Sequence, residues 1–242
     1  MATVPRFHVH AALAVGSAVD LPRSVAHHAA HVLRLRPGDP VVLFDGRGGE
    51  YRGRLSEAGR VDITEHDPLD RASPLAVTLV QCWIASDKLD WVVEKAVELG
   101  AGRILFAPGR RSVVRLDGER RQKRVERLRE IAVAACCQCG LNRIPALAAC
   151  DTLEAALSAG TADGAAGVLL LPGASRSLLD TAPTAHAFAL AIGPEGGFDE
   201  SELELAARAG YEPARLGPRV LRTETAGLAA LAALQARAGD WR

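Results

Sequence analysis

A glycine-rich turn in the C-terminal third of the chain has the composition of a ligand-binding loop. It reads Ile192-Gly-Pro-Glu-Gly-Gly-Phe198 and directly follows Ala187–Ile192, an apolar stretch predicted to be a strand. Asp199 and Glu202 then have the spacing of a helix N-cap and its capping-box partner. Open α/β sheets bind ligands where their strands end, and glycines let backbone amides approach a ligand closely. The pattern predicts a ligand loop, although a plain glycine-rich turn has the same composition.

A second turn of this kind reads Leu216-Gly-Pro-Arg-Val-Leu-Arg-Thr-Glu-Thr-Ala226. It leads from a predicted strand at Ala214–Leu216 into a predicted helix at Thr223–Arg237, which Thr223 or Thr225 could cap. The helix is rich in Ala and Leu on all sides, as is typical of a helix buried in a core or an interface. Two such loops after successive strands predict one shared pocket.

Other catalytic and metal-binding patterns are absent or weak in this sequence. It contains no dinucleotide fingerprint after the first strand of its α/β part, no Walker loop and no Ser-centred nucleophile elbow. Cys136, Cys137 and Cys139 have no second ligand cluster at a useful spacing, so we expect buried thiols and no metal. His27 and His31 lack a nearby carboxylate and a third ligand, and we expect a structural role for them.

The pattern of apolar stretches divides the chain near residue 74. Residues 1–74 are predicted to form a compact β-rich unit with one helix at Val25–Leu35; its predicted strands are Phe7–Leu13, Pro40–Phe44, Tyr51–Leu55 and Arg60–Ile63. The segment 67–74 contains two prolines and no periodicity, and is the best candidate for a linker.

From Leu75 onward, strands alternate with helices, which predicts an α/β unit with a largely parallel sheet. Its other predicted strands are Ala76–Val80, Arg103–Phe106 and Gly167–Leu171, and its other predicted helices are Lys88–Leu99, Glu119–Cys139, Thr152–Ser158 and Ser201–Arg208.

Composition and charge exclude several classes of protein. The chain has 242 residues, 48% of them hydrophobic and 24% charged, which argues against a disordered or fibrous protein. Lys+Arg and Asp+Glu both number 29, so the molecule has no overall basic field. No apolar run is long enough to span a bilayer, no signal peptide is evident, and five cysteines do not suggest a disulfide framework. We therefore expect a cytoplasmic protein with reduced cysteines.

Positive charge is concentrated in residues 103–129, where ten cations face three acids, an excess of seven. A helix with a solvated charged face would account for part of this excess. A contact surface for the phosphates of a nucleic acid is the competing interpretation.

Taken together, the motifs resemble the bacterial 16S ribosomal RNA (uracil-N3)-methyltransferases, enzymes of the SPOUT class that use S-adenosylmethionine. The two C-terminal turns carry most of this resemblance. Further similar segments are Pro5-Arg6-Phe7, His31-Val-Leu-Arg-Leu-Arg-Pro-Gly-Asp39, Phe44-Asp-Gly46, Lys88 to Glu94-Lys95, Glu98-Leu99-Gly100, Ala134 to Gly140 and Asn142-Arg143-Ile-Pro145. The sequence departs from the family at Cys137, where Glu is common, and at Leu141, where Arg is common.

The resemblance implies a PUA-like RNA-binding β-barrel at 1–74 and a SPOUT methyltransferase domain with a C-terminal trefoil knot at 75–242. It implies that S-adenosylmethionine lies among three knot loops. The implied cofactor-binding residues are Leu171, Pro172, Ile192, Gly193, Glu195, Gly196, Gly197, Leu216, Gly217, Leu221, Thr223, Thr225 and Ala226.

The implied reaction removes the proton of uracil N3 and places a methyl group there. Arg222 and Arg219 are the candidates for stabilising negative charge on the base, and Glu195 or Glu224 for accepting the proton, although solvent could equally accept it. The expected RNA contacts are Arg6, Arg34, Arg110, Arg111, Arg115 and Arg143.

The implied partners are 16S ribosomal RNA in the small subunit and a second copy of the chain, bound through the knot domain, with no membrane and no metal. A non-catalytic RNA-binding or ribosome-assembly factor with a degenerate knot is the alternative function. The intact loops Gly193–Gly197 and Leu216–Ala226 argue against that alternative, and the departures at Cys137 and Leu141 argue weakly for it.

Overall fold

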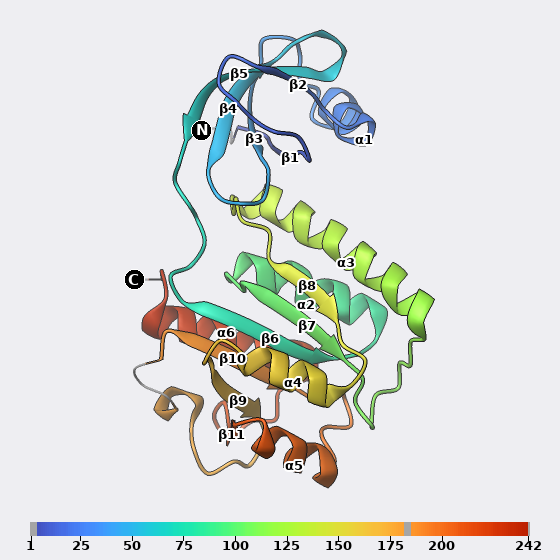
Figure 1. Ribbon diagram of the computed structural model, residues 1–242, viewed down its shortest axis with the longest axis vertical. Helices are drawn as coiled ribbons and strands as arrows, with labels where there is room; N and C mark the ends of the chain where they lie inside the picture. The colour runs from blue at the N-terminus through green and yellow to red at the C-terminus, as the bar shows by residue number, and fades with distance from the viewer. Residues whose placement is uncertain (1–3, 182–184, 242) are drawn as a thin grey trace. The chain divides into compact units, whose positions relative to one another are not determined.

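The structure is a computed structural model that describes residues 4–181 and 185–241 (Figure 1). Its contacts divide the chain into two compact units. Unit 1 comprises Met1–Ala72 and Val133–Ile144, and unit 2 comprises Ser73–Ala132 and Pro145–Arg242. The chain therefore returns to unit 1 for twelve residues after unit 2 has begun, which the sequence pattern does not indicate.

Unit 1 is built on a five-stranded mixed sheet in the order β1-β3-β4-β5-β2. The strands are β1 (Arg6–His8), β2 (Ala18–Asp20), β3 (Pro40–Phe44), β4 (Glu50–Leu55) and β5 (Arg60–Asp67). β1 pairs with β3 in parallel and the other pairs are antiparallel. Alternating apolar residues of these strands form the core of the unit, with Leu43 and Val61 fully buried.

Short helices complete unit 1: α1 (Arg23–His27), the π-helix η1 (His28–Val32) and the 3-10 helix η2 (Glu57–Gly59). The predicted helix at 25–35 is thus confirmed in its middle but begins and ends earlier. Of the predicted strands, Pro40–Phe44 is confirmed at both ends, whereas Phe7–Leu13 was too long and β2 was missed.

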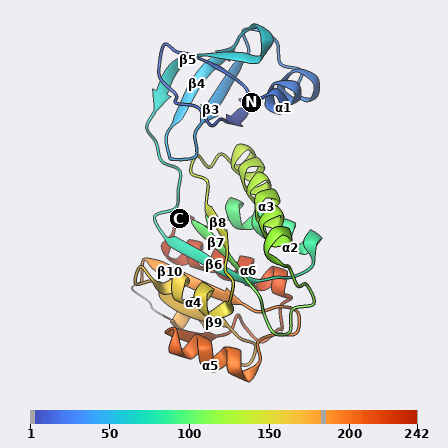
Figure 2. The ribbon, with the colours of Figure 1, turned by 45° about the vertical axis from the view of Figure 1, so that its right-hand side comes forward.

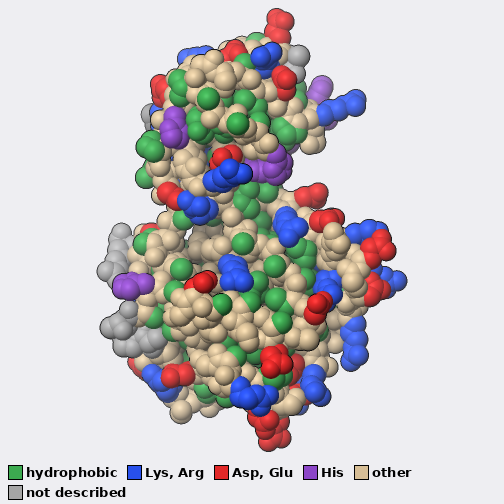
Figure 3. Space-filling model, viewed as in Figure 1, with side chains coloured by type: hydrophobic (Ala, Val, Ile, Leu, Met, Phe, Trp, Pro, Cys, Tyr) green, Lys and Arg blue, Asp and Glu red, His purple; other side chains and the backbone are tan. Residues whose placement is uncertain are grey.

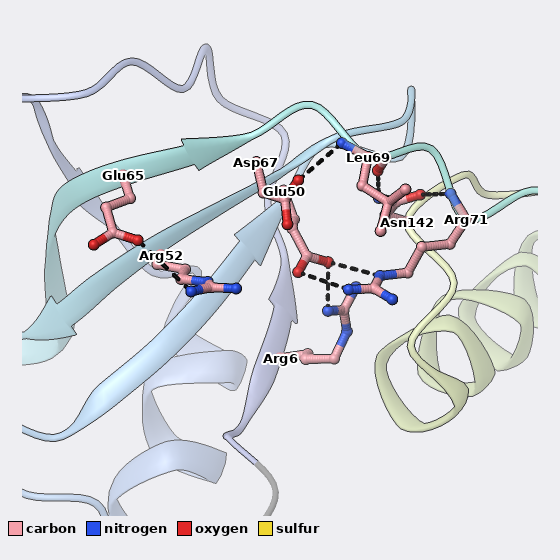
Figure 4. Close-up of polar contacts among 8 residues, drawn as sticks. All are labelled: Arg6, Glu50, Arg52, Glu65, Asp67, Leu69, Arg71 and Asn142. Carbon is pink, nitrogen blue, oxygen red and sulfur yellow. Dashed lines mark hydrogen bonds and ion pairs between the residues drawn. The ribbon is translucent and has the colours of Figure 1, made fainter.

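An ion cluster centred on the buried Glu50 joins β1 and β4 to the segment after β5 (Figure 4). The Glu50 side chain is only 4% exposed and pairs with Arg6 at 2.7 Å and with Arg71 at 3.2 Å. The Arg6 guanidinium also lies over the Phe44 ring, 5.4 Å from its centroid. Burial alone would raise the pKa of Glu50, but the hydrogen bonds and positive charges of Arg71 and Arg6 lower it below its ordinary value.

Asn142 explains why residues 133–144 belong to unit 1. Its side chain is fully buried, accepts a hydrogen bond from the Arg71 backbone and donates one to the Leu69 carbonyl (Figure 4). Its own carbonyl accepts from the Gly48 backbone. Because a buried amide is costly unless these bonds are made, the three bonds specify where this segment packs.

Unit 2 is built on a six-stranded, fully parallel sheet in the order β11-β9-β10-β6-β7-β8, which confirms the predicted α/β class. The strands are β6 (Ala76–Cys82), β7 (Arg103–Ala107), β8 (Ala146–Ala149), β9 (Ala166–Leu170), β10 (Ala187–Ile192) and β11 (Tyr211–Ala214). β8 was missed, and β11 ends where the predicted strand at 214–216 was to begin, because Leu216 is already part of the following loop.

The helices that connect these strands are α2 (Ser86–Glu98), α3 (Gly118–Cys139), α4 (Leu153–Thr161), α5 (Glu200–Arg208) and α6 (Thr223–Ala238), with the 3-10 helix η3 (Leu178–Asp180). In Figures 1 and 2, α4 lies in front of the sheet and α2 and α6 lie behind it. Side-chain alternation along β6 agrees with helices on opposite faces of the sheet. Val80 and Cys82 pack in the core cluster with α4, whereas Gln81, between them, hydrogen-bonds to α6.

No helix within the described residues is long and apolar enough to cross a membrane.

We expect Glu50→Gln to destabilise the protein by about 3 kcal/mol at neutral pH, because removing one partner of a buried ion pair leaves uncompensated charge. The folded pKa of Glu50 is lowered, so its stabilising effect is present at neutral pH and is lost as the pH falls through that folded pKa. Urea unfolding from neutral to acid pH measures both effects, and the variant should lose this part of the acid dependence.

Glu65→Gln is the matched control, since Glu65 is exposed and lies 3.7 Å from an exposed Arg52. It should change the free energy of unfolding little. Equal effects of the two substitutions would contradict the structural role of the Glu50 cluster.

Candidate functional site

A cavity of about 440 Å³ lies at the carboxyl edge of the parallel sheet in unit 2. It is formed where β9, β10 and β11 end, because neighbouring parallel strands place their carboxyl ends together. Most of its lining comes from three chain segments, within 170–172, 192–198 and 214–226, and Lys88 contributes from a fourth. Its volume and its mostly apolar lining suit a small-molecule ligand.

The glycine-rich turn has the local geometry that its sequence predicts. Gly197 has φ +69°, a conformation that side chains with a Cβ rarely adopt. The predicted capping box is confirmed: the Asp199 carboxylate accepts from the Glu202 backbone, and the Glu202 carboxylate accepts from the Asp199 backbone. Hydrogen bonds from Ser201 and the Glu202 backbone lower the pKa of Asp199. The capped start of α5 therefore fixes the end of the turn.

Thr223 does not cap α6 as predicted; it ties the two ligand loops together. Its hydroxyl donates to the Gly193 carbonyl at 2.6 Å and accepts from the Gln81 amide at 3.2 Å. Arg222 is the N-cap residue of α6 and makes no side-chain capping bond, so Thr225 is not the cap either. All three bonded groups belong to elements that meet at the cavity.

Charged side chains gather on one side of the cavity. The Lys88 ammonium lies 3.8 Å from a Glu195 carboxylate oxygen and 3.7 Å from Glu224 Oε1. Glu224 is 12% exposed, and its Oε2 is buried without a hydrogen-bond partner. Arg222 Nη1 is 4.0 Å from Glu224 Oε1, and Arg219 also lines the cavity. This side offers both carboxylates and flexible cations to a ligand.

The structure brings together nearly all of the residues expected at the cofactor and catalytic site. The cavity is lined by Leu171, Pro172, Ile192, Gly193, Glu195, Gly197, Leu216, Gly217, Arg219, Leu221, Arg222, Thr223 and Ala226. Gly196 and Thr225 lie outside the lining. At Gly196 an added Cβ would lie 2.8 Å from the Arg111 Cβ, so the requirement for glycine comes from Arg111.

The sequence analysis missed several residues that line the cavity, of which Lys88 and Phe198 are the most informative. Lys88 stands in the first turn of α2, directly after β6. The rule that parallel strands end at one edge could have identified it, since it applies to β6 as well as to β9 and β10. Phe198 packs against the turn itself, with its ring 3.2 Å from the position of a Cβ on Gly193.

The six arginines expected to contact RNA have different surroundings. Arg6 is buried in the Glu50 cluster with its side chain 10% exposed, which corrects the expectation, because a buried guanidinium cannot meet a phosphate. Arg143 is half exposed and pairs with Asp70. Arg34 is exposed and is the non-glycine residue in the described chain with a positive φ, +56°. Arg110, Arg111 and Arg115 are exposed on the segment after β7.

The cysteine and histidine clusters do not form a metal site in the described part of the chain, where no group of three or more His, Cys, Asp or Glu side chains could hold an ion. Burial raises the pKa of the Cys136 thiol to about 12, so this thiol is protonated at neutral pH. Its surroundings are those of a small buried hydrophobic residue.

Two family models match the chain, an RNA methyltransferase domain at residues 71–235 and an RNA methyltransferase PUA domain at residues 21–64. The ribosomal RNA small subunit methyltransferase E of Mycobacterium tuberculosis is 33% identical, over 97% of this chain and 92% of the relative. The protein of the same name from Bacillus subtilis is 29% identical, over 86% of each chain.

Solved structures with the same architecture cover the whole chain. The ribosomal RNA small subunit methyltransferase E of Neisseria gonorrhoeae, bound to S-adenosyl methionine, has 35% identity and a TM-score of 0.88, over 99% of this chain and 100% of that one. A methyltransferase of Legionella pneumophila in complex with the same cofactor has 32% identity and a TM-score of 0.90 over the same shares.

We expect Thr223→Val to destabilise unit 2 by about 1–3 kcal/mol, because it leaves the Gly193 carbonyl and the Gln81 amide buried without a shared partner. Thr225→Val is the control, since Thr225 is half-buried, lies one position beyond Glu224 and does not line the cavity. Thermal unfolding of both variants measures the difference. A larger loss for Thr225→Val would show that the hydroxyl network is not the connection between the loops.

Proposed function

The chain belongs to the RNA methyltransferase family, and we propose that it transfers a methyl group from S-adenosylmethionine to N3 of a uridine in the 16S ribosomal RNA of the small subunit. One observation carries the proposal: the residues of the two motifs meet in one cavity of a chain that matches a cofactor-bound ribosomal RNA methyltransferase over its whole length. Specificity for uridine N3 rests on the resemblance of the motifs to that family.

The cavity residues fit S-adenosylmethionine. Leu171, Ile192, Leu216 and Leu221 provide apolar walls for the adenine ring, and the backbone of 192–197 and 216–226 provides polar groups for its edge and for the methionine part. The buried Glu224 oxygen without a partner and the neighbouring Glu195 match a ligand that carries positive charge. When bound, the cofactor supplies a methyl group on a positively charged sulfur, and this sulfur is released as a neutral thioether when the methyl group is transferred.

The protein residues then have three tasks. They hold the uracil ring with N3 in line with the methyl group, accept the N3 proton, and stabilise negative charge on the base. Arg222 and Arg219 suit the third task, since both side chains are exposed at the cavity rim and are free to turn toward a base. Glu195, 33% exposed and facing Lys88, is the candidate acceptor, with Glu224 deeper in the site as the alternative and solvent as a further route.

We also propose that the C-terminal segment forms the trefoil knot that the resemblance implies. The loop after β9 contacts both ends of the segment that would pass through it. At one end Arg215 exchanges backbone hydrogen bonds with Arg176 and Leu178, and at the other end Arg237 donates to the Leu179 carbonyl. These bonds support a closed loop around residues 215–237.

RNA binding is assigned by this proposal to both units. In unit 1, a PUA-like barrel would present Arg34, whose left-handed backbone conformation lies in an exposed segment, and Arg143. In unit 2, the exposed arginines after β7 would contact the phosphate backbone, with Arg110, Arg111 and Arg115 as donors.

We expect Arg222→Ala to lower kcat on the order of 100-fold while leaving the Kd for S-adenosylmethionine unchanged, because the guanidinium acts on charge that develops on the base. The assay is methylation of small ribosomal subunits that lack the modification, with the product nucleoside identified by mass spectrometry. Arg208→Ala is the control, since Arg208 is exposed on α5 and pairs with Glu204.

Two outcomes would overturn parts of the proposal. Binding of RNA with neither cofactor binding nor methylation by the unaltered protein would favour the alternative, an RNA-binding assembly factor. A methylated nucleoside other than 3-methyluridine would support methyltransferase activity but reject N3 of uridine as the target atom.

A homodimer through unit 2 is part of the proposal. The leucines of α6 are buried within the protomer and cannot form its interface: Leu228, Leu231 and Leu234. The half-exposed Ala229, Ala232 and Ala233 on α6 are the better candidates. We expect Ala232→Glu to shift sedimentation equilibrium from dimer to the 25.5 kDa monomer without unfolding. A parent protein that is already monomeric at micromolar concentration would reject the dimer.

A further inference from the structure

A second groove, of about 760 Å³, lies in unit 2 beside the loop that follows β7. Its walls are this loop, the start of α4 and the first half of α5. Its lining includes the apolar residues Trp83, Leu153 and Leu205 and the exposed Arg111 and Arg115. A lining of this kind has the chemistry to take a nucleotide, with apolar contacts for the base or sugar and charged donors for the phosphate.

The loop after β7 separates this groove from the cofactor cavity and contacts the glycine-rich turn directly. Arg111 Nη1 donates to the Gly196 carbonyl at 3.1 Å, and the Arg110 backbone donates to Glu202 at 2.8 Å. At Gly109 an added Cβ would lie 3.1 Å from the Pro194 ring. One side of the loop thus supports the turn that lines the cofactor cavity, while the other side forms the wall of the groove.

The groove is lined by four arginines and four acidic residues, but most of the acidic side chains already have hydrogen-bond or ion-pair partners. Asp151 pairs with Arg121, and Asp199 pairs with Arg110. Both oxygens of Glu202 accept backbone hydrogen bonds. Glu154 is the remaining acid on the lining, and it is exposed.

Arg111 and Arg115 are different, because neither forms an ion pair with a carboxylate among the described residues. Asp199, which pairs with Arg110, is close enough for the charge of Arg111 to help lower its pKa. Arg111 uses one nitrogen for Gly196 and retains its others, since a guanidinium has five N–H donors. The groove therefore offers free guanidinium donors to an anion.

The helical part of the positively charged stretch has fewer cationic side chains available to an anion. On α3, Arg120 pairs with Asp117, Lys123 pairs with Glu119, and Arg124 and Arg127 share Asp90. On the face drawn in Figure 3, blue and red side chains are likewise interspersed over unit 2. The excess of positive charge in residues 103–129 is thus most available to an anion at the loop.

We propose that this groove binds a phosphodiester of the RNA strand that enters the methylation site, with Arg111 and Arg115 as donors, and that Arg111 links strand binding to the cofactor loop through Gly196. The inference rests on the proposed function, which already assigns both arginines to the phosphate backbone, and adds to it the groove and the link to the cofactor loop. Guanidinium groups bind phosphate oxygens in pairs, so an occupied groove holds the Arg111 side chain in the orientation that also supports Gly196. Because coupling is reciprocal, RNA raises cofactor affinity by the factor by which the cofactor raises RNA affinity.

The test uses the full chain and a short single-stranded oligouridylate as the probe. Binding is measured by fluorescence anisotropy over a series of salt concentrations for the unaltered protein, Arg111→Ala, Arg115→Ala and Arg120→Ala. Each groove variant should weaken binding several-fold and reduce the slope of log K against log salt by about 0.7, one phosphate contact on a single strand. Arg120→Ala is the matched control, since Arg120 belongs to the same charged stretch and does not line the groove.

Calorimetry with S-adenosylhomocysteine, with and without the oligouridylate, separates the two roles. RNA should raise its affinity in the unaltered protein and in Arg115→Ala at saturating RNA, and should have no effect in Arg111→Ala. Thermal unfolding of Arg111→Ala checks that this variant is folded. If it is not, Arg115→Ala still tests the groove.

Equal effects of Arg120→Ala and the groove variants would overturn the site, because they would mean that RNA senses only the overall charge. Unchanged coupling in Arg111→Ala would overturn the link. Both results are independent of methylation, so a protein that binds RNA in the groove but leaves small subunits unmethylated would reject the proposed function alone.

Discussion

Everything at the candidate site depends on one constraint, the parallel pairing of β9, β10 and β11. Parallel strands end at a common edge, so segments at 171, 193 and 216 are brought together although more than twenty residues separate each from the next in sequence. Backbone pairing alone would leave three loops free to move. The Thr223 hydroxyl, shared between the Gly193 carbonyl and Gln81, joins two of them to the sheet beneath. The chemistry of the cavity is therefore positioned by backbone geometry and one buried network.

Buried polar groups, in addition to the apolar core, determine how the segments of unit 1 pack. Glu50 pairs with Arg6 and Arg71, which lie near the two ends of the first segment of the unit. Asn142 brings in the second segment, 133–144, which interrupts unit 2 in the sequence. Such groups are poor sources of net stability compared with apolar residues, yet each is costly if left unpaired. Their effect is to allow one arrangement of these segments and to penalise others.

The sequence predicted the features that local chemistry determines. The turns at 192–198 and 216–226, the capping box at Asp199 and the alternation of strands and helices were found because each depends on residues close together in the chain. The association of 133–144 with unit 1 was missed because it depends on bonds from Asn142 to residues about seventy positions away. Arg6 was wrongly expected to contact RNA for the same reason, since no residue near it in the sequence indicates that it pairs with Glu50. Gly196 was expected to bind the cofactor, but it lies outside the cavity lining, and the atoms nearest to an added Cβ belong to Arg111.

The single helix α3 has a consequence for the order in which the protein can be made. Its residues up to Ala132 belong to unit 2, and those from Val133 belong to unit 1, so unit 1 is not a continuous piece of chain. Domains usually fold one after another as a chain leaves the ribosome, beginning at the N-terminus. Here the N-terminal unit stays unfinished until residue 144 has emerged, by which time β6, α2 and β7 of the other unit are already outside. Unit 1 therefore completes its folding only after synthesis of unit 2 has begun, and a chain cut near residue 74 separates most of unit 1 from its segment 133–144.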